Sequence, residues 1–356
     1  HRAISTPNYR ILLYHLKKKG RMTMKRIVTL TISILLLFGS LSACTQSIAT
    51  ALSEQENLSE VNWYYEFFSD KDDKVAVTDN QTVLLNKGIV TVNQSVSSNG
   101  YTIALESAIS DGYRSFFKFR VTAPTGSILD GDRYVFDCSS RITGKNGEDL
   151  NLTFNAAGDE TLEDNNITDN EITILYESTT APTEESAGIM KHGTVWTISI
   201  SKISEYLIVD DGAEKRRELE KEIPGEWVFS ITFDESTLLS DEYECLSTPI
   251  RYPAERYKRE HSFPVTVQLT SFKIRAFGGT LCYDKPLTGF WEGIELEPMF
   301  VHLKDGTAVE AHFRTGQNKT DHWESVFEFA IPMAVGDIDY IDFPGSQKIL
   351  VSTGHS

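Results

Sequence analysis

The feature that most constrains the fold is a period-two alternation of apolar and polar residues, which begins near Asn86 and recurs along the chain. Such alternation places apolar side chains on one face of a β-strand and polar side chains on the other. Because no long segment has helical periodicity, the sequence predicts an all-β fold. The clearest alternation runs through Phe117, Phe119 and Val121, through Trp196, Ile198 and Ile200, and through Trp227, Phe229, Ile231 and Phe233.

Turn signals divide residues 86–238 into about eight strands, which is typical of a β-sandwich. Asn99-Gly100 predicts a tight hairpin, because these residues tolerate the positive φ angles of a type I′ turn, and Asp111-Gly112 is a second turn signal. The charged segment Asp211–Glu222 is interpreted either as a short helix or as a solvated excursion between two strands. Further strands are predicted at Ile89–Val96, Thr102–Ile109, Arg133–Ile142, Leu150–Asn155 and Glu171–Glu177.

A second, smaller β-sandwich is predicted at 265–356, after a linker at 239–264 in which the alternation is lost and charge increases. Val267 and Phe272 lie an odd number of residues apart, so they would point to opposite faces of a regular strand. A β-bulge near Thr270-Ser271 is therefore needed to place both side chains in the core. Asp305-Gly306 predicts another hairpin. The sequence therefore predicts two β-sandwich domains in tandem.

The N-terminal region has the pattern of a lipoprotein signal. Residues 1–23 are basic and patternless, so we interpret them as upstream read-through and Met24 as the start. Residues 24–43 have a charged start and an apolar run shorter than the roughly 20 residues of a spanning helix, which indicates a cleaved signal peptide. Their last residues and Cys44 form the lipobox Leu-Ser-Ala-Cys, so lipid on Cys44 is expected to hold the protein at the outer face of the cell membrane. The alternative is an uncleaved membrane anchor, which would also leave the rest outside.

Residues 44–85 are predicted to form a tether that contains an aromatic cluster at 61–68. Trp and Tyr often lie at a membrane interface. The alternative, which we favour, is that the cluster packs against the first domain.

The charge balance excludes some partners. The segment before Cys44 contains eight of the 34 Lys and Arg residues and none of the 51 Asp and Glu residues, so the chain from Cys44 onward has a net charge of −25. Nucleic acid and anionic lipid would repel such a protein.

Three Cys residues remain after Cys44: Cys138, Cys245 and Cys282. We favour a Cys245–Cys282 disulfide, although spacing alone does not fix connectivity. The sequence contains no CxxC or Cys/His motif of a zinc site, so no metal and no cofactor is predicted.

Several segments resemble known families of extracellular domains. Asn93–Val96, Ser98–Ile103 and Ala108–Gly112 resemble the opening of the immunoglobulin-like family called domain of unknown function 4179. Val301–Thr307 and Asp337–Ile341 resemble its C-terminal companion, domain of unknown function 5643.

This resemblance, which covers residues 86–352, implies two immunoglobulin-like β-sandwich domains outside the membrane of a Gram-positive bacterium. Some members of the family are encoded beside extracytoplasmic-function sigma factors and look like anti-sigma ectodomains. The family supplies no catalytic residues. Because we expect no cytoplasmic segment before the signal, direct binding of a sigma factor is not predicted.

Candidate sites in the sequence favour binding over catalysis. No Gly-x-Ser-x-Gly elbow, His-Glu-x-x-His or phosphate-binding glycine loop occurs, so an enzyme is not predicted. His302 and His312 are expected on adjacent strands of one hairpin but on opposite faces, because His302 is predicted to pair with Val309, which argues against a shared metal. One locally basic stretch, which is either a linker or a surface for an anionic wall polymer or acidic protein, contains Arg251, Arg256, Lys258 and Arg259.

An acidic group of residues suggests Ca²⁺ through carboxylate ligands, but its spacing matches no known loop, so solvated charge is the favoured interpretation. It comprises Asp159, Glu160, Glu163, Asp164, Asp169 and Glu171.

The sequence therefore predicts a non-enzymatic surface lipoprotein that acts as a binding or adhesion module. Its partners are the membrane, through the lipid on Cys44, and an unknown envelope protein, wall polymer or extracellular ligand. The alternative is an envelope sensor or regulator related to anti-sigma ectodomains.

Overall fold

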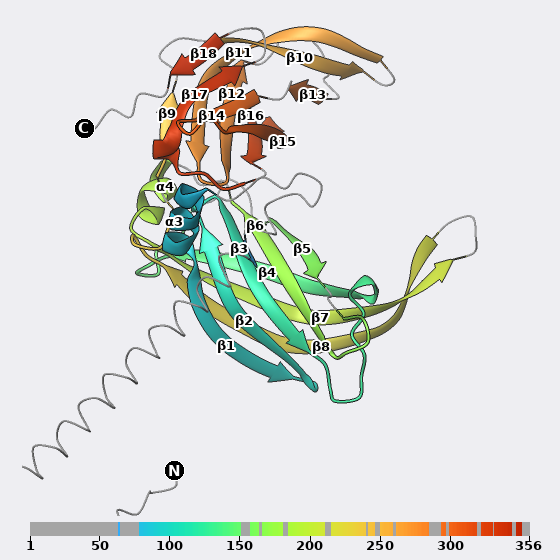
Figure 1. Ribbon diagram of the computed structural model, residues 1–356. Coiled ribbons are helices and arrows are strands. Elements are labelled where there is room, and N and C mark those ends of the chain that lie inside the picture. Colours follow the sequence, from blue (N-terminus) through green and yellow to red (C-terminus); the bar gives the residue numbers. More distant parts are fainter. Residues whose placement is uncertain are drawn as a thin grey trace, which may run out of the picture. The chain divides into compact units, whose positions relative to one another are not determined.

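The computed structural model describes residues 63–64, 78–150, 157–163, 166–180, 184–210, 215–239, 241–245, 250–258, 261–284, 293–296, 299–318, 322–329, 331–343 and 347–350 (Figure 1). All of these residues belong to one compact unit, Glu60–Ser356. The predicted read-through segment, signal peptide and Cys44 lie outside them. Strands dominate the described residues, so the predicted all-β fold class is confirmed. None of the helices in this part of the chain has the length and hydropathy needed to cross a membrane.

Two antiparallel sheets pack against each other and share a hydrophobic core (Figure 1). The alternating residues of the sequence build it: Phe117 and Phe119 of one sheet meet Trp196 and Phe229 of the other, with ring centroids 5.3 and 5.2 Å apart. One sheet has the strand order β1-β2-β3-β6-β5 and the other β4-β7-β8. The bounds are β1 Val90–Ser98, β2 Tyr101–Ser110, β3 Arg114–Thr122, β4 Tyr134–Gly144, β5 Ala157–Glu163, β6 Glu171–Thr179, β7 Thr194–Asp210 and β8 Lys215–Phe233.

Local turn chemistry fixes the register of the first hairpins. Asn99 and Gly100 have φ angles of 49° and 82°, as a type I′ turn requires, and Ser98 pairs with Tyr101 across the turn. Gly112 also has a positive φ, of 88°, in the turn between β2 and β3. Both predicted hairpin turns are therefore confirmed.

The C-terminal strands form one large antiparallel sheet around a second core. Its order is β13-β10-β11-β12-β16-β15-β14-β17-β18, and β9 pairs with β11. The register of β11 against β12 shifts between Leu269 and Ser271, which confirms the predicted bulge, and Leu269 and Phe272 are both fully buried. The bounds are β9 Tyr243–Cys245, β10 Ile250–Lys258, β11 His261–Arg275, β12 Gly278–Asp284, β13 Gly293–Leu296, β14 Met299–Leu303, β15 Ala308–Asn318, β16 His322–Phe329, β17 Ile338–Phe343 and β18 Gln347–Leu350.

Two segments that lack apolar alternation are nevertheless strands. The segment 239–264, interpreted above as a linker, contains β9, β10 and the start of β11, because β10 pairs along its whole length with β11. Residues 215–222 belong to β8, so the short helix considered for Asp211–Glu222 is wrong. Backbone pairing with a neighbouring strand, rather than burial of one face, decides both structures.

A third hydrophobic cluster joins the N-terminal part of the described chain to both strand systems. Tyr64 is fully buried in it, and the Ser107 hydroxyl donates a hydrogen bond to the Tyr64 hydroxyl at 3.4 Å. Of the two alternatives for the aromatic cluster, packing against the fold is therefore confirmed for Tyr64.

Helices are short in the described chain. α3 Asp79–Gly88 begins with a capping box, in which Thr78 and Gln81 each accept a hydrogen bond from the other's backbone N–H. Further helical elements are α4 Glu184–Met190, η1 Gly131–Arg133 and η2 Val335–Asp337, and residues 63–64 are helical as well.

The register also tests the favoured disulfide. Cys245 pairs with Phe272 and Cys282 pairs with Ser271, so the two Cys residues lie on the strands that flank β11. Two strand spacings put their Cα atoms about 9.6 Å apart, whereas a disulfide joins Cα atoms within about 6.8 Å. The expectation of a Cys245–Cys282 disulfide is therefore wrong for this arrangement.

Candidate functional site

The last part of β7 and the first part of β8 form a two-stranded ribbon that projects beyond β4 (Figure 1). β4 accompanies β7 only as far as the pair Tyr134 and Glu205. From Tyr206, which pairs with Leu219, to Asp210, which pairs with Lys215, β7 pairs with β8 alone in the described chain. We call residues 206–210 and 215–219 the ribbon.

One face of the ribbon carries exposed apolar side chains, next to Arg217, which pairs with Ile208 on the same face. Tyr206 and Ile208 alternate onto the same face of β7, and Leu219 of β8 lies directly opposite Tyr206 on that face. Leu219 is 54% exposed and Ile208 is 39% exposed. The pair Tyr206 and Leu219 also stabilises the two strands, but side chains this exposed bury little area within the protein, which favours a contact surface.

The base of the ribbon is held by Arg133. Its guanidinium forms ion pairs with Glu205 of β7 at 2.9 Å and with Glu220 of β8 at 2.7 Å, and its Nε donates a hydrogen bond to the Tyr206 carbonyl oxygen at 3.2 Å. Burial, together with the adjacent Glu205 carboxylate, raises the pKa of Tyr134 well above its ordinary value. These Arg133 contacts therefore fix the direction in which the ribbon leaves the sheet.

Side chains of β1 cover the outer edge of β8 below the ribbon. The Gln94 amide donates to the Ser230 carbonyl oxygen at 2.7 Å and accepts from the Ser230 N–H at 3.2 Å, as a neighbouring strand would. The Ser98 hydroxyl accepts a hydrogen bond from the Glu226 N–H. Protection of this kind prevents unwanted strand pairing, and it covers the part of β8 that follows the ribbon.

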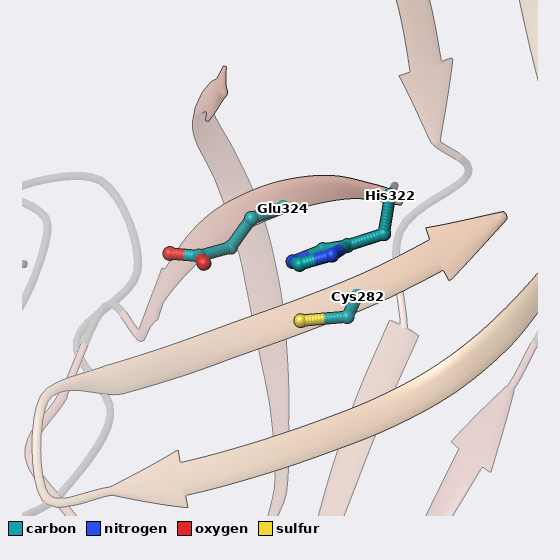
Figure 2. Close-up of side chains that lie close together, drawn as sticks. All are labelled: Cys282, His322 and Glu324. Carbon is teal, nitrogen blue, oxygen red and sulfur yellow. The ribbon is translucent and has the colours of Figure 1, made fainter. Parts of the chain in front are cut away.

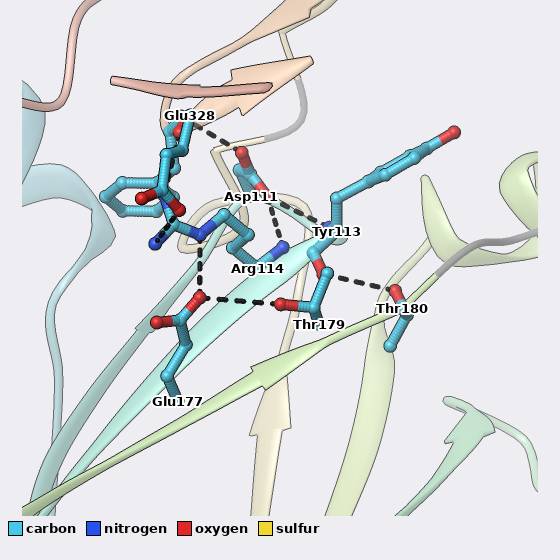
Figure 3. Close-up of polar contacts among 8 residues, drawn as sticks. Asp111, Tyr113, Arg114, Glu177, Thr179, Thr180 and Glu328 are labelled. Carbon is cyan, nitrogen blue, oxygen red and sulfur yellow. Dashed lines mark hydrogen bonds and ion pairs between the residues drawn. The ribbon is translucent and has the colours of Figure 1, made fainter. Parts of the chain in front are cut away.

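A buried polar cluster joins the β2–β3 turn to the β11–β12 turn (Figure 3). Arg114 donates from Nε to Glu177 at 2.9 Å and from Nη1 to the Phe277 carbonyl oxygen at 3.0 Å, and its Nη2 lies 3.1 Å from Glu328. Asp111, which is 3% exposed, accepts hydrogen bonds from the backbone N–H groups of Arg114 and Phe277. Because one guanidinium holds two carboxylates and a backbone carbonyl oxygen, and Asp111 holds backbone N–H groups of both turns, we interpret the cluster as a structural junction.

A small pocket beside this junction is lined by Tyr113, Arg275 and Lys273, among others. The Arg275 guanidinium lies 3.2 Å from the centre of the Tyr113 ring and is paired with Glu242. Burial raises the pKa of Tyr113 to about 12, although Arg275 opposes the shift. Lys273 lies 3.6 Å from Glu244 and 4.0 Å from Glu242. Both cations therefore have carboxylate partners, which disfavours an anion site here.

The basic residues singled out in the sequence lie on or next to one strand. Arg251, Arg256 and Lys258 belong to β10, which pairs with both β11 and β13. Arg259 and the predicted lipidation site Cys44 lie outside the described residues. Binding by the basic stretch remains a prediction.

The acidic residues do not gather into one loop. Asp159, Glu160 and Glu163 lie on β5, and Asp164 is outside the described residues. Asp169 accepts a hydrogen bond from the Glu171 backbone N–H.

The two histidines share a face, contrary to the sequence-based pairing. His302 pairs with Ala308 instead of Val309, because the turn contains one residue more than expected. His302 and His312 therefore point the same way, but their positions are four residues apart along the hairpin, about 13 Å. His302 instead stacks on Tyr340 with ring centroids 4.2 Å apart.

Sequence reasoning missed the ribbon. The available signal was the run Tyr206-Leu207-Ile208-Val209, four consecutive apolar residues that interrupt the alternation of β7 beside a charged segment.

No family model matches the chain, and no curated protein matches it. A solved structure described as the conserved domain protein from Bacillus anthracis is 13% identical, with a TM-score of 0.43 over 78% of this chain and 82% of that one.

Proposed function

We propose that this protein is a non-enzymatic binding lipoprotein of the cell envelope, held outside the membrane by lipid on Cys44, and that the ribbon is its contact surface. The observation that carries the proposal is the exposed apolar face formed by Tyr206, Ile208 and Leu219 on a two-stranded projection. Exposed apolar patches on a folded protein mark interaction sites.

The proposed partner is a protein. Anionic wall polymers and anionic lipids are disfavoured, because the chain from Cys44 onward has a net charge of −25. A ribbon that combines an apolar face with an outer strand edge suits pairing with a strand of another protein, in which backbone hydrogen bonds supply affinity and side-chain contacts supply specificity.

The experiment is site-specific photo-crosslinking in intact host cells. A photoreactive residue replaces Leu219 in the ribbon, or Val228, which is 53% exposed on the same strand and serves as the matched control. A third position, Arg256, samples the basic stretch of β10.

We expect one discrete protein adduct from position 219 that weakens when Ile208→Asp is added, and none from position 228. Equal adducts from 219 and 228, or none from 219, would contradict the ribbon as the contact surface. A discrete adduct from position 256 alone would transfer the binding role to the basic stretch.

A further inference from the structure

Three side chains with metal-binding atoms meet on two neighbouring strands of the C-terminal sheet (Figure 2). Cys282 comes from β12, and His322 and Glu324 come from β16. The Cys Sγ, one imidazole nitrogen and one carboxylate oxygen all lie within 4.8 Å of one another, and all three residues are half-buried.

The strand register sets this arrangement. Cys282 pairs directly with Glu324, and two residues along, Asp284 pairs with His322. The intervening pair, Tyr283 and Trp323, points to the opposite face.

Core packing holds that opposite face in place. Tyr283 is 1% exposed, its hydroxyl hydrogen-bonds with that of Ser325 at 3.2 Å, and Trp323 packs against the same core. A slip of one residue would move Tyr283 out of the core, so the sheet fixes the face on which Cys282, His322 and Glu324 lie.

We propose that Cys282, His322 and Glu324 bind a single Zn²⁺ ion. Zinc accepts thiolate, imidazole and carboxylate ligands together, whereas Mg²⁺ and Ca²⁺ require oxygen ligands. On binding, the Cys282 thiol releases its proton to solvent, and the thiolate and carboxylate together balance the charge of the ion.

The geometry needs only a small adjustment to reach a zinc shell. Ligand atoms in a tetrahedral shell with bonds of 2.0–2.3 Å are about 3.5 Å apart. Since the present separations are all within 4.8 Å, rotation of the side chains has to close at most about 1.3 Å. Water takes the fourth position. Asp284 pairs directly with His322 across the two strands. We expect its carboxylate to accept a hydrogen bond from the second imidazole nitrogen when zinc is bound, as outer-shell carboxylates do.

The zinc ion would connect β12 to β16 in the middle of the large sheet. Its site is formed by strands other than β7 and β8, so this proposal and the proposed binding function stand or fall separately.

The test uses the full-length chain, purified and stripped of metal, so it does not depend on where the protein is located. Equilibrium dialysis against zinc sulfate is expected to load one zinc per chain, and titration with Co²⁺ is expected to give the near-ultraviolet charge-transfer absorption of a cobalt–thiolate bond. Cys282→Ser and His322→Asn should lose the site, whereas Cys138→Ser, a half-buried Cys on β4, should keep it. Asp284→Asn should weaken binding by about 10- to 100-fold, as expected for an outer-shell partner.

The proposal is overturned if the unmodified protein gives no cobalt–thiolate band, a result that needs no variant to fold. It is also overturned if the band survives in Cys282→Ser, or if zinc loading is equal in His322→Asn and the unmodified protein. Circular dichroism of the metal-free variants identifies any loss of zinc that is caused by unfolding.

Discussion

Replacing Arg114 with Ala should destabilise the fold far more than replacing its strand neighbour Arg120. The Arg114 side chain is 11% exposed, and its partners Glu177 and Glu328 are 13% and 24% exposed. Removal of one partner from a buried ion pair costs about 3–5 kcal/mol, because a charge is left unpaired. Residual solvation of the two carboxylates places the expected loss near the lower end, about 3 kcal/mol.

Arg120 is the matched control, since it lies on the same strand and also forms ion pairs, with Glu106 and Glu171, but its side chain is 48% exposed. Exposed pairs contribute about 0–1 kcal/mol, so Arg120→Ala should be nearly neutral.

The assay is urea unfolding followed by Trp fluorescence and circular dichroism, with the free energy of unfolding extrapolated to water. A difference between the two variants of less than about 1 kcal/mol would refute the conclusion that the Arg114 cluster is a desolvated structural junction. A second transition that appears only in Arg114→Ala would show that the cluster also couples the unfolding of the two strand systems.

Three further predictions test local features. Gly278→Ala should lower the free energy of unfolding by about 1–3 kcal/mol, because Gly278 has a φ of +152° and a Cβ there would lie 2.2 Å from a backbone carbonyl oxygen. Thermal melts measure the loss, and Gly336→Ala, where a Cβ would meet open space, is the control. Tyr113 should ionise at about pH 12 in an ultraviolet titration. Because the pKa of Tyr113 is raised in the folded state, the stability that this residue contributes is complete below about pH 10 and is lost as the pH rises towards 12. A phenolate signal that appears near pH 10, the ordinary pKa of tyrosine, would contradict the burial of Tyr113. Gln94→Ala should cost about 1 kcal/mol and speed hydrogen exchange of the Ser230 N–H; unchanged exchange would show that the Gln94 amide does not protect this edge.

Much of the fold follows from local sequence signals. Alternation identified Phe117 and Trp196 as core residues, since half-buried strands need one apolar face, and both are fully buried. Asn99-Gly100 identified a turn that few other residues can form. The change of parity between Val267 and Phe272 located a bulge, because both residues must reach the same core.

Features decided by pairing with distant strands could not be predicted in this way. The segment 215–222 has no apolar period, and it is a strand because β7 pairs with it. His302 changed its predicted face because the hairpin turn contains one more residue than Asp305-Gly306 suggests.

The candidate sites depend on the same long-range pairing. The grouping of Cys282 with His322 requires the register of two strands that are distant in sequence.

The start of α3, by contrast, did have a local signal, because Thr78 and Gln81 have the spacing of a capping box.

The most direct test of the proposed role at the envelope is the mass of the N-terminal peptide of the protein extracted from host membranes. We predict that the mature chain begins at Cys44 and that this residue carries a diacylglyceryl group on its sulfur. An unmodified Cys44, or a mature chain that retains the residues before it, would contradict lipid anchoring and with it the proposal that this protein acts as a surface-bound binding lipoprotein.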